Sequence, residues 1–104
     1  SNAMAANRMR PIHPGEILAE ELGFLDKMSA NQLAKHLAIP TNRVTAILNG
    51  ARSITADTAL RLAKFFGTTP EFWLNLQDAY DIKMALKKSG KKIEKEVTPY
   101  DQAA

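Results

Sequence analysis

The chain has 104 residues, 45% of them hydrophobic, and a formal net charge of +3, which suits one folded domain and leaves no room for a second catalytic lobe. It contains no cysteine, so disulfides, thiolate metal sites and cysteine nucleophiles are excluded and a reducing, cytoplasmic location is expected. No segment approaches the roughly 18 to 20 consecutive apolar residues of a membrane-spanning helix.

Composition and pattern divide the chain into four regions. Residues 1–3 precede Met4 and are interpreted as a remnant of tag removal, and residues 4–12 as an N-terminal arm. Residues 13–86 carry helical patterning and form the predicted folded domain. Residues 87–104 are rich in lysine and are interpreted as a basic C-terminal tail.

Apolar residues recur with helical spacing over most of residues 14–86, and no long stretch alternates with the period of two that is typical of a strand. This pattern predicts an all-α domain of five helices. The first begins at Pro14, because proline suits the first helical position. Its inward side consists of Leu18, Leu22 and Leu25.

The second predicted helix begins after Ser29, which forms a capping box with Gln32, and it ends before Pro40. The third runs from about Thr41 to Asn49, with Gly50 as its left-handed stop. The inward residues of these two helices are Leu33, Ala34, Leu37, Val44, Ile47 and Leu48.

A fourth helix is predicted between a cap at Thr55 and a stop at Gly67. The fifth begins with a cap at either Thr68 or Thr69, and both fit the sequence. The apolar side of the fourth consists of Ala59, Leu60, Ala63 and Phe66, and that of the fifth of Phe72, Trp73, Leu76, Ala79 and Tyr80.

The fifth helix is expected to end near Leu86. The run of lysines at residues 87–92 then predicts a solvated hinge. Ile93 and Val97 fit either a last helical turn or a strand, and the pattern does not decide between the two.

Positive charge is concentrated in residues 29–67, where five lysines and arginines stand against a single acidic residue, Asp57. A polyanion is therefore attracted to this segment before any other folded part. An ordinary solvated surface is the alternative, so the charge needs support from a motif.

Residues 32–50 supply that motif, because two short helices joined by a brief turn and flanked by further helices form a helix-turn-helix. At about 100° of rotation per residue, the outer side of the third helix lies opposite Val44. Asparagine, arginine and threonine on that side can contact base edges, although a polar exterior can also serve solubility alone. The predicted base-reading residues are Thr41, Asn42, Arg43, Thr45, Ala46 and Asn49.

Contacts with the DNA phosphates are expected from two places beside the third helix. The backbone amides around Ala30 and Asn31 begin the second helix and point toward an anion. Arg52, just past Gly50, reaches the next phosphate, and Lys35 is a weaker candidate.

Three further stretches make the motif more specific. They are HPGEIL at residues 13–18, LNGARSIT at residues 48–55 and ALRLAKFFGTTPEFWLNLQDAYD at residues 59–81. Residues 32–50 resemble the helix-turn-helix of the phage repressor and Cro (XRE) class, and residues 13–81 together resemble the HigA-type, or VapI-like, antitoxins. Pro40 departs from the Ser or Thr cap that is common in the wider class.

This resemblance implies a phage-repressor-like DNA-binding fold and two activities. The first is dimeric repression of the chain's own operon at an inverted-repeat operator. The second is binding and neutralisation of a HigB-type toxin, a small basic mRNA-cleaving endonuclease, within a type II toxin-antitoxin module. The resemblance does not transfer a base sequence.

A homodimer is also predicted from the fifth helix. Phe72 and Trp73 are adjacent and about 100° apart, so both cannot point inward equally. Part of the helix is therefore expected to pack on a second protomer, which presents two reading helices about 34 Å apart. The predicted interface residues are Phe72, Trp73, Leu76 and Tyr80.

No enzyme, metal site or cofactor is expected. His13 and Glu16 are spaced i, i+3 but have no third ligand nearby. His36 is expected on the surface near DNA. The sequence has no glycine-rich phosphate loop, no GxSxG and no HExxH motif.

Two alternative functions remain. One is a stand-alone repressor without a toxin, and the other is a protein-interaction module that has lost DNA binding. The candidate landing site for a basic partner such as the toxin is a set of acidic residues, Glu16, Glu20, Glu21 and Asp26.

Overall fold

The computed structural model describes residues 10–103, and within that range it contains five α-helices, one short 3-10 turn and no strand. The prediction of an all-α, five-helix fold is therefore confirmed. The proposed tag remnant and most of the N-terminal arm lie outside the described residues. The elements are α2 (Pro14–Phe24), α3 (Ala30–Leu37), α4 (Thr41–Leu48), α5 (Ala56–Phe66), α6 (Pro70–Glu96) and the turn η1 (Tyr100–Gln102).

The first two helices begin with capping boxes, which satisfy backbone amides that have no partner inside a helix. At α2 the ring Nδ1 of His13 accepts from the Gly15 amide at 2.9 Å, and the Glu16 carboxylate accepts from the His13 amide at 3.1 Å. At α3 the Ser29 hydroxyl accepts from the Gln32 amide at 3.1 Å, and the Gln32 side chain accepts from the Ser29 amide at 2.8 Å. The predicted starts at Pro14 and Ser29 are both confirmed.

The structure shows which of the two candidate threonines caps α6. Thr69 is the cap, since its hydroxyl accepts from the Phe72 amide at 3.2 Å and Pro70 follows it in the first turn. Thr68 has a different partner, because its hydroxyl accepts from the indole Nε1 of Trp73 at 2.9 Å. The preceding helix α5 ends as predicted at Gly67, with φ of 74°.

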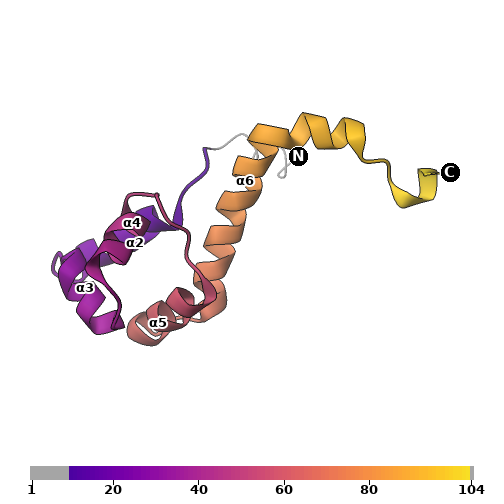
Figure 1. Ribbon diagram of the computed structural model, residues 1–104. Helices are drawn as coiled ribbons and strands as arrows, with labels where there is room; N and C mark the ends of the chain where they lie inside the picture. Colours follow the sequence, from indigo (N-terminus) through magenta and orange to yellow (C-terminus); the bar gives the residue numbers. More distant parts are fainter. Residues whose placement is uncertain (1–9, 104) are drawn as a thin grey trace.

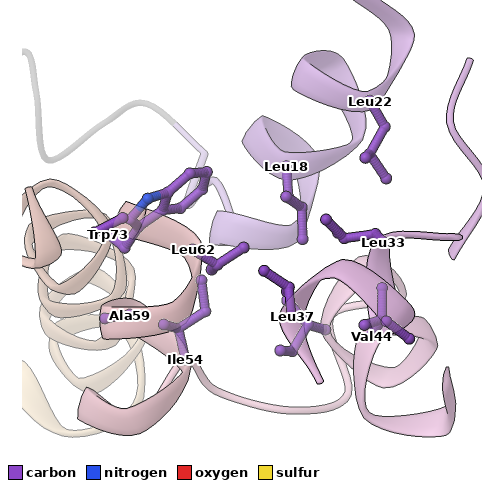
Figure 2. Packing of buried hydrophobic residues seen from close by; sticks show 12 residues of the cluster. Leu18, Leu22, Leu33, Leu37, Val44, Ile54, Ala59, Leu62 and Trp73 are labelled. Atoms are coloured by element: carbon purple, nitrogen blue, oxygen red, sulfur yellow. The ribbon is translucent and has the colours of Figure 1, made fainter. Parts of the chain in front are cut away.

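The core forms where all five helices meet, and Figure 2 shows their apolar side chains converging. Burial of each large side chain there contributes about 1.5 to 3 kcal/mol. The buried side chain of Gln77 is hydrogen-bonded through both of its polar atoms. Its oxygen accepts from the Ile54 amide at 2.8 Å, and its nitrogen donates to Asp81 at 2.9 Å. The buried apolar residues are Leu18, Leu22, Leu33, Ala34, Leu37, Val44, Ile47, Ile54, Ala59, Leu62, Ala63 and Trp73.

Two leucines that were predicted to face inward are on the surface. Leu60 is 60% exposed, because α5 packs between α3 and α6 and its inward side is centred on Leu62. Leu25 is 41% exposed, because α2 ends at Phe24 and the chain turns there. Spacing alone fixes neither which side of α5 meets its neighbours nor the residue at which α2 ends.

The expected hinge at residues 87–92 is also wrong, since α6 continues without interruption for 27 residues. Lysine is a good helix former, and extension of an existing helix needs no new nucleus. Ile93 is therefore helical, whereas Val97 is extended. Figure 1 shows α6 leaving the other helices and changing direction along its length, which gives the described chain its extents of 56 × 25 × 23 Å.

Within residues 10–103, no helix is both long and apolar enough to cross a membrane.

Candidate nucleic-acid interface

The beginnings of α3 and α4 are joined by a side-chain hydrogen bond. The Thr41 hydroxyl donates to Oδ1 of Asn31 at 2.9 Å. The chain turns between the two helices at Ala38, which is left-handed with φ of 55°. Pro40 precedes α4 and offers no side-chain cap. A predicted base-reading residue and a predicted phosphate-binding residue therefore lie side by side.

Helix α4 has one buried and one exposed side. Val44 and Ile47 are buried, and α4 packs mainly on α3 and α2. Ala46 is half-buried. Thr45 donates its hydroxyl to the Thr41 carbonyl at 2.9 Å, so its oxygen remains available only as an acceptor. The four exposed residues among the six predicted base readers are Thr41, Asn42, Thr45 and Asn49.

Arg43 differs from those four. Its side chain is only 30% exposed, and its NH1 lies 3.9 Å from Oδ2 of Asp57, at the start of α5. The sequence predicted Arg43 as a base-reading residue, but the contact with α5 was not anticipated. The structure therefore separates Arg43 from the exposed residues of α4.

Asp57 was missed as a candidate functional residue. Its Oδ2 accepts from Nε of Arg61 at 2.8 Å, one helical turn along α5. That hydrogen bond, with the charges of Arg61 and Arg43, holds the pKa of Asp57 below its usual range despite an opposing effect of desolvation. The i, i+4 spacing of Asp57 and Arg61 was visible in the sequence, whereas Arg43 and Asp57 lie on different helices, with 13 residues between them.

The end of α4 brings Arg52 to the surface beside the reading helix. Gly50 has φ of 75°, and the Ala51 amide donates to the Ala46 carbonyl at 2.8 Å, which closes the helix with a Schellman motif. Arg52 follows immediately and is exposed. Of the other predicted phosphate contacts, Asn31 and Lys35 are exposed and Ala30, the first residue of α3, is half-buried.

A close approach of two helices holds α4 in place. A Cβ atom at Gly15 of α2 would overlap the carbonyl group of Ile47 in α4. Only glycine therefore allows α2 and α4 to approach this closely. This contact is not visible in the sequence, because Gly15 lies in an otherwise ordinary first turn of α2.

The predicted dimer interface needs one correction. Trp73 has no exposed surface and donates its indole N–H to Thr68, so it belongs to the core of the protomer. The adjacent Phe72 is 42% exposed. Leu76 and Tyr80 are half-buried and line a groove of about 190 Å³ between α6 and α2. The complete lining is Ile12, Ile17, Leu76, Ala79, Tyr80 and Lys83.

Only some of the acidic candidates for a basic partner are free. Arg10 donates to both oxygens of Glu16 at 2.9 and 2.8 Å, and these bonds lower the pKa of Glu16. The same carboxylate also caps α2, so its role there is structural. Glu20 and Asp26 are exposed, and Glu21 is half-buried.

The other histidine, His36, is on the surface as predicted. Its ring stacks on Phe65 with 4.9 Å between the ring centroids. This contact joins α3 to α5.

The chain is similar to known proteins over most of its length. A family model described as "Helix-turn-helix" matches residues 25–73. The chain is 52% identical over 79 residues to virulence-associated protein I of Dichelobacter nodosus, covering 76% of this chain and 73% of that protein. It is 40% identical over 81 residues to antitoxin HigA-1 of Vibrio cholerae, covering 76% and 74%.

A solved structure extends the similarity to the fold. It is that of Pseudomonas aeruginosa antitoxin HigA with the higBA promoter. Its TM-score is 0.83 at 43% sequence identity, and the match covers 88% of this chain and 99% of that chain.

Proposed function

This chain belongs to the HigA-type, or VapI-like, family of helix-turn-helix proteins, and from that premise we propose that it is an antitoxin with two activities. It binds operator DNA of its own operon as a dimer, and it binds and neutralises a HigB-type, mRNA-cleaving toxin. No catalytic step and no cofactor is assigned to it, and it acts in the cytoplasm. The observation that carries the proposal is the exposed polar side of α4 within a helix-turn-helix.

The exposed residues of α4 are assigned to the major groove. The Asn42 amide suits adenine, whose edge offers one acceptor and one donor. Thr45 contributes its methyl group and an acceptor oxygen, because its hydroxyl proton is bound to Thr41. Asn49, one turn beyond Thr45, extends the same exposed side. The remaining proposed base contacts are Thr41, Arg43 and Ala46.

The start of α3 and the residue after α4 are assigned to phosphates. The Asn31 side chain accepts from Thr41 through its oxygen and keeps its N–H₂ group for a phosphate. Arg52 supplies a positive charge at the opposite end of the reading helix. Ala30, through its backbone amide, and Lys35 complete this set.

Replacement of Asn42 by alanine tests the DNA-binding proposal. The probe is a duplex that the wild-type protein selects from a random pool. Loss of one bidentate base contact is worth about 1 to 3 kcal/mol, so the dissociation constant should rise about 5- to 150-fold in fluorescence anisotropy. Gln102→Ala removes another exposed amide, far along the chain from α4, and should leave the dissociation constant unchanged.

Failure of the wild-type protein to enrich any duplex would contradict the DNA-binding function as a whole. If the wild type enriches a duplex and Asn42→Ala binds that duplex equally well, Asn42 makes no base contact, but the DNA-binding function stands.

A dimer is proposed through the outer side of α6. Phe72, Leu76 and Tyr80 remain candidates after the removal of Trp73, because each keeps exposed surface. Two protomers related by a two-fold axis would place two α4 helices about 34 Å apart, to match an inverted repeat. Residues 13–86 would carry both DNA binding and dimerisation.

The toxin activity is tested by co-expression with the product of the neighbouring gene. We expect the chain to restore growth of cells that express that protein, and to co-purify with it after nuclease treatment. Asn42→Ala should rescue growth equally well, since it affects only DNA contacts. If toxicity persists and no complex forms, the chain is better described as a stand-alone repressor.

A further inference from the structure

Two arginines from different helices converge on one carboxylate beside the reading helix. Oδ2 of Asp57 accepts from Nε of Arg61 at 2.8 Å and lies 3.9 Å from NH1 of Arg43. Arg61 also donates to the Leu37 carbonyl at the end of α3, at 2.9 Å. Asp57 therefore connects the recognition helix α4 to the other helix of the motif through α5.

The two arginines are bound unequally. Arg61 has short hydrogen bonds to a carboxylate and to a carbonyl. The 3.9 Å separation of Arg43 is an ion pair without a hydrogen bond. No acceptor within residues 10–103 reaches the buried Nε of Arg43. The Arg43 guanidinium is thus attracted to Asp57 but retains donors for another acceptor.

Such an arrangement affects different DNA sequences unequally. A free arginine gains counterion-release energy from any phosphate, whatever the sequence. A carboxylate that holds the arginine competes with this contact and also repels the phosphates themselves. To leave the carboxylate, the arginine must gain hydrogen bonds in addition to charge neutralisation. Only a base edge that accepts two hydrogen bonds in the right geometry, such as that of guanine, provides them.

We propose that Asp57 is a specificity-determining positioning residue, which holds Arg43 at the α4–α5 edge until operator DNA supplies a matching acceptor. Asp57 touches no base in this scheme and acts through Arg43. Its effect is to weaken binding to unrelated DNA more than binding to the operator. The inference rests on the DNA-binding function proposed above.

The test compares affinities for two duplexes, the one selected by the wild-type protein and a scrambled duplex of the same composition. Asp57→Asn should raise affinity for the scrambled duplex more than for the selected one, and lower the ratio of the two affinities about two- to fivefold, the range of an exposed ion pair. Asp78→Asn makes the same charge change at an exposed site on α6 and should leave the ratio unaltered. Asp57→Glu keeps the carboxylate and should restore most of the ratio.

A double-mutant cycle distinguishes positioning from a purely structural role. In an Arg43→Ala background, Asp57→Asn should no longer change the ratio. If the change persists there, Asp57 acts through Arg61 and the packing of α3, and the inference is wrong. It is also wrong if Asp57→Asn behaves like Asp78→Asn while the wild type still distinguishes the duplexes. If the wild-type protein binds the selected and the scrambled duplex equally well, both the proposed sequence-specific DNA binding and the inference are wrong.

Discussion

Trp73→Ala is expected to lower the free energy of unfolding by about 3 to 5 kcal/mol, the usual loss for an aromatic side chain removed from a core. Trp73 has no exposed surface and packs beside Phe66 and Phe72, with ring centroids 5.7 and 5.1 Å away. The substitution also leaves the Thr68 hydroxyl without its donor. Since small domains are stable by only about 5 to 15 kcal/mol, much of this chain should be unfolded near 37 °C. Urea denaturation followed by circular dichroism measures the change.

Phe72→Ala is the matched control, one residue away on the same helix. Because Phe72 is 42% exposed, its loss should affect the protomer much less and act on association instead. Light scattering over a dilution series should show dissociation at a higher concentration than for the wild type. Equal losses of unfolding free energy in the two variants would contradict the division of α6 into a core side and an outer side.

That division shows where sequence reasoning reaches its limit in this fold. The helix starts were predictable because capping is local: Ser29 and Gln32 satisfy each other within one turn. Periodicity could state that Phe72 and Trp73 do not both point inward, but the choice depends on α5, which packs against α6. The same dependence on neighbours reversed the expected orientation of Leu60.

The candidate site was predictable to a similar extent. The exposed side of α4 follows from helical geometry once Val44 and Ile47 are recognised as inward. The partnership of Arg43 with Asp57 does not, since it depends on where the chain places the start of α5 relative to α4. Residues 87–92 failed for another reason: a run of lysines was interpreted as a hinge, although lysine also extends a helix that has already formed.

Gly15→Ala is expected to destabilise the chain by roughly 3 kcal/mol, because the added methyl group overlaps the backbone of Ile47 rather than a mobile side chain. The overlap can be relieved only by separation of α2 from α4. Since Ile47 lies on the buried side of the reading helix, the same movement displaces Asn42 and Thr45. Affinity for the selected duplex should therefore fall even at temperatures where the variant remains folded.

Gly23→Ala provides the control within the same helix. A Cβ at Gly23 meets nothing within 4 Å, so alanine there should stabilise the chain by up to about 1 kcal/mol through helix propensity. The same substitution at two positions of α2 should thus change the free energy of unfolding in opposite directions. If Gly15→Ala is neutral or stabilising, α2 and α4 are not held at the separation that the structure shows, and the position of the reading side has to be revised with it.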